Sequence, residues 1–245
     1  MRKIFLLLGF LLFILGCTKP GDCVESTGRL IVKPFKVSGF KKIIVYKGIG
    51  LVLTQGPEFK VEVQTGENLM DGIQVKVVDS LLSLRDNTTC NFVREYGHTT
   101  VFVTSPTIIE LTSKTEKTIS SNGILTYRII RLFSMDLSDG AGTGDFNLEI
   151  NNSQTVIENN NVARYHISGK TDELLLNFYD GNGRFEGENF EAKNIIIFQR
   201  GSNDMIVKPI ESITGKIVST GNVILKNTPP EVDVKELYRG RVIYN

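Results

Sequence analysis

The feature that most constrains this chain is a short phrase that recurs between residues 122 and 226. Each copy has a small or turn-forming residue, a variable residue and then apolar residues. Successive copies lie 17 to 22 residues apart when the apolar anchors are taken as Ile124, Phe146, Ala163, Phe185, Met205 and Val223. A repeat of about twenty residues is typical of the stacked coils of a β-solenoid. We therefore expect an all-β, single-domain, right-handed β-helix with irregular coils of about twenty residues.

Details within the repeat give further expectations. Residues 174–176 and 195–197 are short apolar runs and predict strands of three or four residues between turns. The three asparagines at 159–161 predict left-handed backbone at a coil corner, with asparagine ladders between coils. A β-sandwich also uses short strands and is the alternative architecture. The spacing and the stacking of like residues favour the solenoid.

The segment before the repeat has a different pattern. Apolar and polar residues alternate through residues 40–46, 49–53, 59–63, 73–77, 82–84 and 100–104, as in strands with one buried face. Residues 56–57 and 79–80 are turn signals between these strands. Residues 67–71 predict a helix of a turn or two, and residues 30–32 predict a short pairing strand.

The first sixteen residues have the pattern of an export signal. Arg2 and Lys3 precede an apolar run over residues 4–15, which is shorter than the roughly 20 residues that span a bilayer. The run ends Leu15-Gly16-Cys17, which resembles the lipobox of bacterial lipoproteins, and an ordinary secretory signal with a chance cysteine is the alternative. We expect a signal peptide at 1–16, a lipid anchor at Cys17 with a tether at 17–38, and the solenoid at 39–245.

The remaining cysteines and the charge balance fit an exported protein. With Cys17 lipidated, Cys23 and Cys90 are a candidate disulfide, which would stabilise the fold by about 4 kcal/mol. Equal numbers of free thiols with and without reductant would contradict that bond. Without Arg2 and Lys3, 26 basic residues face 27 acidic ones. This near-neutral balance argues against nucleic-acid binding.

Acidic residues beside glycine turns are the strongest candidates for chemistry. On adjacent coils they would supply the carboxylates of a polysaccharide-active enzyme, although aspartate beside glycine more often bonds local backbone. The residues are Asp139, Asp145, Asp180 and Asp204. The Asp/Gly runs do not match calcium loops, and His98 and His166 lie too far apart in sequence to suggest zinc. We expect no catalytic residues, no metal and no cofactor.

Aromatic residues offer a second candidate surface. Tyr127, Tyr165 and Tyr179 fall in or near successive coils, and the chain has no tryptophan. An exposed tyrosine stripe would suit a sugar ligand. The alternative, which we favour, is that these rings stack inward or stand alone.

Several segments resemble the GIN-domain family, described as the head domains of autotransporter adhesins. The most specific are Phe-Lys-Lys-Ile-Ile-Val at 40–45 and Gly-Leu-Val-Leu-Thr-Gln-Gly at 50–56, followed by Gly-containing phrases at 138–142, 201–204 and 219–223. The resemblance covers nearly the whole mature chain. It implies a fold like that of pectin-lyase-type β-helices without their catalytic residues, and a role in adhesion or surface interaction.

The functional expectation is a non-enzymatic cell-envelope lipoprotein that acts as an adhesion or surface-interaction module. Its expected partners are the outer membrane, through the lipid anchor on the periplasmic or cell-surface side, and a glycan or protein ligand. The alternatives are a polysaccharide-active enzyme and an envelope scaffold without an extracellular ligand. The ligand itself and the oligomeric state are left open.

Overall fold

The computed structural model describes residues 27–88, 99–135, 140 and 142–245. It is an all-β domain, with 65% of residues in strands and 3% in helix. The strands form a β-solenoid of about six turns, each of about 21 residues. The predicted fold is confirmed, and the sandwich alternative is set aside.

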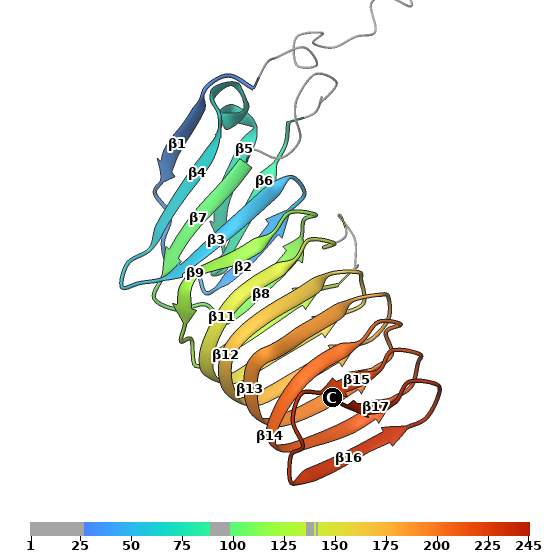
Figure 1. Ribbon diagram of the computed structural model, residues 1–245. Helices are drawn as coiled ribbons and strands as arrows, with labels where there is room; N and C mark the ends of the chain where they lie inside the picture. Colours follow the sequence, from blue (N-terminus) through green and yellow to red (C-terminus); the bar gives the residue numbers. More distant parts are fainter. Residues whose placement is uncertain (1–26, 89–98, 136–139, 141) are drawn as a thin grey trace, which may run out of the picture.

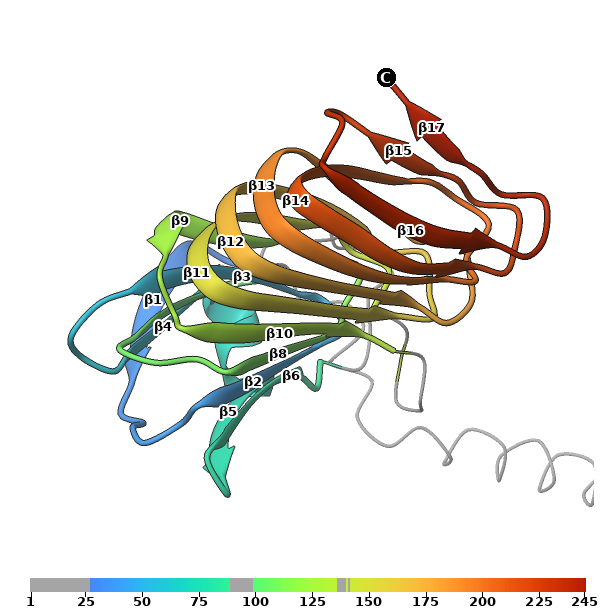
Figure 2. The ribbon, with the colours of Figure 1, turned by 90° about the horizontal axis from the view of Figure 1, so that it is seen from below.

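Each turn of the solenoid has two sides, and apolar side chains fill the space between them (Figures 1 and 2). The first side is formed by β5 (Ile73–Val78), β6 (Leu81–Asp86), β2 (Lys42–Tyr46), β8 (Glu110–Lys114), β10 (Ile129–Ser134) and β16 (Glu231–Glu236). The second side is formed by β1 (Leu30–Phe35), β4 (Lys60–Gly66), β7 (Thr99–Ser105), β3 (Ile49–Gln55), β9 (Ile119–Leu125), β15 (Val223–Leu225) and β17 (Val242–Tyr244). Four long strands belong to both sides: β11 (Phe146–Asn159), β12 (Arg164–Phe178), β13 (Arg184–Gln199) and β14 (Met205–Ile217).

The long strands correct the prediction of short ones. Residues 174–176 and 195–197 are the second halves of β12 and β13, not separate strands. Each long strand bends from the second side to the first while its parallel ladder continues, as in β11 paired with β12 from Phe146 to Asn159. Register shifts between β13 and β14 absorb extra residues at the bend. The bend therefore needs no break in the strand.

The interior stack follows the predicted repeat with two corrections. Parallel registers align Phe146, Tyr165, Phe185, Met205 and Val223 on successive coils. The rings of Phe146 and Tyr165 lie nearly parallel, with centroids 4.8 Å apart. The predicted anchor Ala163 is therefore two residues too early.

The first predicted anchor is wrong. Ile124 is 47% exposed, and Ile119 is the residue that aligns with Phe146. The physical reason is a register shift between β9 and β11, which lets residues 122–124 bulge outward while Leu125 returns to the core.

The asparagine run does not adopt left-handed backbone. Among described residues other than glycine, positive φ occurs at Asp79 and Ser80, in the predicted turn before β6. Asn159 is instead buried, where its amide donates to the carbonyl oxygen of Asn161 (3.0 Å) and accepts from the Tyr165 hydroxyl (3.3 Å). Glycines such as Gly181 supply the positive φ at the corners.

The N-terminal strands form where the alternation predicts them, but their spatial order is not that of the sequence. β2 lies between β6 and β8, and β3 lies between β7 and β9 (Figure 1). The first coil of the chain is therefore the second along the axis. β1, β4 and β5 add antiparallel edges, and the predicted helix is a 3-10 helix, η2 (Glu67–Gly72). Residues 30–32, expected to form a strand at the end of the tether, lie within β1.

Some expectations fall outside the described residues. These are the signal segment, the lipidation site Cys17, the disulfide candidates Cys23 and Cys90, and also His98 and Asp139. Within the described ranges, the structure contains no helix of the length and apolar character that a membrane span requires.

Candidate functional site

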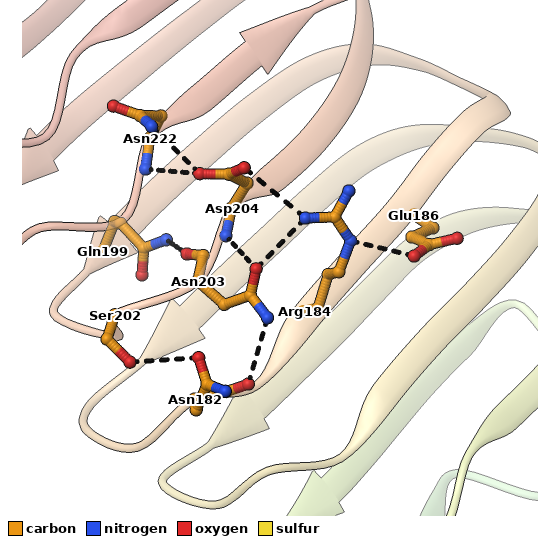
Figure 3. Close-up of polar contacts among 8 residues, drawn as sticks. All are labelled: Asn182, Arg184, Glu186, Gln199, Ser202, Asn203, Asp204 and Asn222. Carbon is orange, nitrogen blue, oxygen red and sulfur yellow. Dashed lines mark hydrogen bonds and ion pairs between the residues drawn. The ribbon is translucent and has the colours of Figure 1, made fainter.

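A polar ladder runs across the turns that lead from the first side to the second (Figure 3). Its centre is Arg184, whose guanidinium donates to Glu186 Oε1 (2.9 Å), Asn203 Oδ1 (3.1 Å) and Asp204 Oδ2 (3.4 Å). Asp204 Oδ1 in turn accepts from the backbone and side-chain amides of Asn222, both at 3.1 Å. Because the charged groups satisfy one another across three coils, the ladder is a staple between coils, not an open binding site.

The sequence also predicts asparagine ladders between coils. Such contacts occur at these turns, but they involve other asparagines than residues 159–161. Asn203 donates through its side-chain amide to the carbonyl oxygen of Asn182 on the preceding coil (3.4 Å). Asn222 accepts from the backbone N–H of Arg241 on the next coil (3.1 Å). Asparagine contacts between coils therefore exist, but they come from residues 182, 203 and 222.

The candidate carboxylates do not converge among the described residues. Asp180 is exposed and accepts from the backbone N–H of Gly181 (2.8 Å), which is the expected turn chemistry. Asp145 and Asp204 occupy equivalent corner positions, but Arg164 and Arg184 stand on the two coils between them. Three strand spacings put their backbones about 14 Å apart. They cannot act on one glycosidic bond as a pair.

The described residues also offer no cluster of three or more His, Cys, Asp or Glu side chains for a metal ion. His166 Nδ1 lies 3.1 Å from Glu186 Oε2, at the margin of the polar ladder. It thus has a structural neighbour on the adjacent coil.

The tyrosines do not form an exposed stripe. Tyr127 and Tyr165 are buried, and burial raises the pKa of both hydroxyls well above its ordinary value. The Tyr127 hydroxyl donates to the carbonyl oxygen of Ser105 (3.0 Å). Tyr179 is half-buried and packs near Phe198, with ring centroids 5.7 Å apart. The inward alternative is therefore correct for two of the three rings.

A groove with a volume of about 670 Å³ lies on the opposite corner, where the long strands bend. Its walls come from the connection between β9 and β10 and from the bends of β11, β12, β13 and β14, which follow one another along the axis (Figure 2). The residues that line it are Thr126, Arg128, Asn151, Asn152, Ser153, Lys170, Thr171, Asp172, Glu191, Lys193 and Ile210. All but Ile210 are polar or charged.

The backbone fixes one wall of this groove. The carbonyl oxygen of Arg128 accepts from the backbone N–H groups of Ser153 (3.2 Å) and Gln154 (3.1 Å) at the bend of β11. On the same connection, the backbone N–H of Thr126 donates to Gln55 Oε1 (2.6 Å). The connection is therefore held to β11 at Arg128 and to β3 at Thr126.

Charges alternate along the groove from coil to coil. Registers align Asn151, Lys170, Glu191 and Lys208 on four successive strands. Glu191 Oε1 lies 2.8 Å from Lys208 Nζ, and the pKa of Glu191 is lowered by this hydrogen bond, by the Lys208 charge and, less, by Lys170. These neighbours favour the ionised form of Glu191.

A second charged row lies beside the first. Lys193 Nζ lies 2.6 Å from Asp172 Oδ1, and the hydrogen bond and charge of Asp172 raise the pKa of Lys193. No ion pair joins Arg128 to any residue in the described part of the chain. Both acids of the groove are therefore paired, whereas the guanidinium of Arg128 and the ammonium of Lys170 have no ion-pair partner among the described residues.

The chemistry of the groove suits a hydroxyl-rich ligand with an anionic group. The exposed hydroxyl of Ser153 and the exposed ammonium of Lys170 lie on its walls, and the guanidinium of Arg128 can bind carboxylate or sulfate in a bidentate way. Sequence reasoning missed this groove because most of its residues lie in the middle of long strands, where separate short strands were expected. The available signal was the repeated pairing of opposite charges at 170–172 and 191–193.

Comparison with solved structures identifies relatives of this fold. A putative adhesin from Bacteroides fragilis NCTC 9343 has a TM-score of 0.80 at 20% identity, with 90% of this chain and 100% of that chain covered. A putative adhesin from Parabacteroides merdae ATCC 43184 has a TM-score of 0.66 at 16% identity, covering 92% and 100%. A putative lipid binding protein from Parabacteroides distasonis ATCC 8503 has a TM-score of 0.64 at 14% identity, covering 89% and 99%. At these identities the likeness shows the fold alone.

The sequence comparison gives the family. No curated protein matches the chain. The model of the family described as "Putative auto-transporter adhesin, head GIN domain" matches residues 39–229, which is most of the solenoid and agrees with the resemblance seen in the sequence. The chain belongs to this GIN-domain family.

Proposed function

We propose that this protein is a non-enzymatic surface-interaction module of the bacterial cell envelope, and that it binds a carbohydrate chain in the groove at the strand bends. The observation that carries the proposal is the polar lining of that groove, in which Lys193 and Asp172 pair while Arg128 has no described partner. Family membership supports an adhesive role. The separation of Asp145 from Asp204 argues for binding without cleavage.

The chemical class of the ligand follows from the lining. Sugar hydroxyls exchange hydrogen bonds with the exposed hydroxyl of Ser153 and accept from the exposed ammonium of Lys170. A carboxylate or sulfate on the sugar would pair with Arg128. Because the groove follows the coil axis across four strands, it suits an extended oligosaccharide better than a single sugar.

The anchor is part of the same proposal. A lipid on Cys17 would hold the solenoid to the outer membrane through the tether that follows it. Intact-mass spectrometry of the protein from bacterial membranes should show an acylated N-terminal Cys17, and Cys17→Ser should leave the signal segment attached or the protein unanchored. An unmodified chain that begins elsewhere would contradict the anchor and leave the groove proposal standing.

A glycan array with product analysis tests the main proposal. The chain from Thr18 onward, which contains every described element, is applied to neutral, uronate-containing and sulfated oligosaccharides while the solution is monitored for released sugars. We expect retention on acidic oligosaccharides without released product. Product that disappears in Asp180→Asn or Asp204→Asn variants would favour the polysaccharide-active enzyme. Absence of retention on every oligosaccharide would contradict carbohydrate binding and favour an envelope scaffold.

A further inference from the structure

The C-terminal end of the solenoid presents two edge strands. The registers place β16 beside β14 and β17 beside β15, and no register gives either strand a second neighbour among the described strands. Both edges face away from the N-terminal strands, at the far end of the axis (Figure 1). One row of backbone N–H and C=O groups on each edge is therefore open to another chain.

The direction of these groups can be assigned on β16. The backbone N–H of Leu237 donates to the carbonyl oxygen of Ile217 on β14 (2.8 Å). Peptide groups alternate sides along a strand, so the odd-numbered residues of β16 bond β14. Val232, Val234 and Glu236 therefore direct their N–H and C=O groups to the open edge.

The side chains at this end are both apolar and oppositely charged. Leu237 is 61% exposed and Tyr244 is 57% exposed, close to the two edges. Asp233 and Lys235 are exposed on the outer face of β16, and no ion pair joins either of them to a residue in the described ranges. The two opposite charges are separated by one residue, which places them on the same face.

We propose that this edge pairs with the same edge of a second copy of the chain, so that β16 and its symmetry mate form an antiparallel pair centred on Val234. In this register Val234 lies opposite itself, and its outward backbone groups form a reciprocal pair of hydrogen bonds. Asp233 then lies opposite Lys235 of the second copy, and Lys235 lies opposite that copy's Asp233. Both are non-hydrogen-bonded pairs, in which side chains approach most closely.

The charges select this register over its alternatives. A two-fold pair can be centred on a residue whose backbone groups point outward, which is Val232, Val234 or Glu236, or on a residue that bonds β14, which then lies opposite itself in a non-hydrogen-bonded pair. Centres of the second kind, at Glu231, Asp233 or Lys235, each oppose a charged residue to itself and so bring like charges together. A centre at Val232 opposes Asp233 to Glu231, which brings like charges together twice. A centre at Glu236 opposes Lys235 to Leu237 and gives Lys235 no partner. The Val234 centre alone makes two attractive pairs without opposing any like charges, which suits a two-fold, self-complementary interface.

The pairing is independent of the groove and adds to it. The groove lies at the bends between β9 and β14, whereas β16 is an edge of the C-terminal end. A dimer would therefore carry two grooves. Two weak sites on one particle bind a repetitive surface more tightly than either site alone.

A charge swap tests the pairing. The mass of the chain from Thr18 onward is measured by light scattering and sedimentation over a concentration series. We expect the wild type to pass from monomer to dimer as concentration rises. Asp233→Lys and Lys235→Asp should each weaken dimerisation by about tenfold or more, because each creates two like-charge pairs. The double swap should restore it, because the attractive pairs return with their signs exchanged.

The control is Lys76→Asp, which makes the same charge change as Lys235→Asp on the exposed face of β5, at the N-terminal end of the solenoid. It should leave the dissociation constant within about twofold of the wild type. Circular dichroism verifies that each variant is folded. A wild type that remains monomeric at every concentration would overturn the proposal. A dimer that withstands both single changes, or one that the double swap does not restore, would overturn it as well.

Discussion

The N-terminal coils and the repeated coils share one two-sided cross-section but are assembled differently. From β11 to β14 each strand lies beside the next strand of the chain, so every coil contacts its neighbours in sequence. In the N-terminal part, Ile43 pairs with both Leu82 and Leu111, because β2 is inserted between β6 and β8. The repeated coils can therefore form one after another, whereas the insertion needs long loops to close first.

The two ends of the solenoid also differ, in the direction of their edge strands. The N-terminal end is finished by antiparallel strands, and its outermost strand β1 contains Pro34, which has no N–H to offer a further strand. At the C-terminal end the outermost described strands are β16 and β17, and each is parallel to its single described neighbour. The solenoid is therefore bounded by antiparallel strands at one end, whereas its other described end has the parallel edges on which the proposed pairing depends.

The largest expected effect comes from the aromatic stack of the repeated coils. Phe185→Ala should lower the free energy of unfolding by about 3–5 kcal/mol, because the side chain is fully buried between coils. Hydrogen exchange should accelerate most in β12, β13 and β14 and least in β2, β3 and β7. The half-exposed Phe133→Ala is the control, with an expected loss of about 1 kcal/mol. Uniform acceleration across both regions would contradict nearest-neighbour stacking.

Two glycines distinguish the stability cost of a collision between coils from the cost of backbone strain alone. Gly215 and Gly123 both have positive φ, at 130° and 85°. A Cβ at Gly215 would collide with the carbonyl oxygen of Ile197 on the preceding coil, whereas a Cβ at Gly123 meets no atom within 4 Å. Denaturant unfolding should show a loss of about 3 kcal/mol for Gly215→Ala and about 1 kcal/mol for Gly123→Ala. Equal losses would show that coil spacing adjusts without cost.

The polar ladder should contribute less than the core. Arg184→Met keeps much of the apolar stem and removes the bonds to Glu186, Asn203 and Asp204, so we expect a loss of about 1 kcal/mol in thermal or urea unfolding. The N-terminal control is Lys60→Met, because the Lys60–Glu62 pair is exposed and should contribute almost nothing. A larger loss at Lys60 than at Arg184 would reverse the ranking.

The smallest effect is expected from the exposed charges of the groove. The pKa of Glu191 is lowered in the folded state by Lys208, so its contribution to stability exists above its unfolded pKa and is lost as pH falls through the folded value. Glu191→Gln should lower the melting temperature barely measurably at pH 7 and not at all at pH 3. A larger difference at pH 3 than at pH 7 would show that the sign is wrong.

The sequence predicts different things well in the two regions. In the N-terminal part, alternation and turn residues locate the strands, including the left-handed turn at Asp79 and Ser80. Alternation is a local property, so it carries no information that β2 inserts between β6 and β8. In the repeat, the spacing predicts the stacked architecture, but the strand ends are wrong because hydrogen-bond ladders continue through the bends.

The candidate site shows the same limit. Asp180 behaves as a turn residue, as its glycine neighbour indicates. The groove could not be predicted because it depends on the register that aligns Lys170 with Glu191, and on a β9–β10 connection that arrives from an earlier coil. Arg128 has no distinguishing motif in the sequence. Its significance comes only from the partner it lacks in the described fold.

The most direct test of the account is the affinity of two arginine variants for an acidic oligosaccharide retained by the wild type, measured by titration calorimetry. Arg128 lines the groove, whereas Arg200 is an exposed arginine at the opposite corner, outside it. We predict that Arg128→Gln weakens binding by about tenfold or more, the loss of one charge-assisted hydrogen-bonding group, while Arg200→Gln changes it by less than about twofold. Equal affinities for the two variants, or a larger loss for Arg200→Gln, would contradict the assignment of the groove.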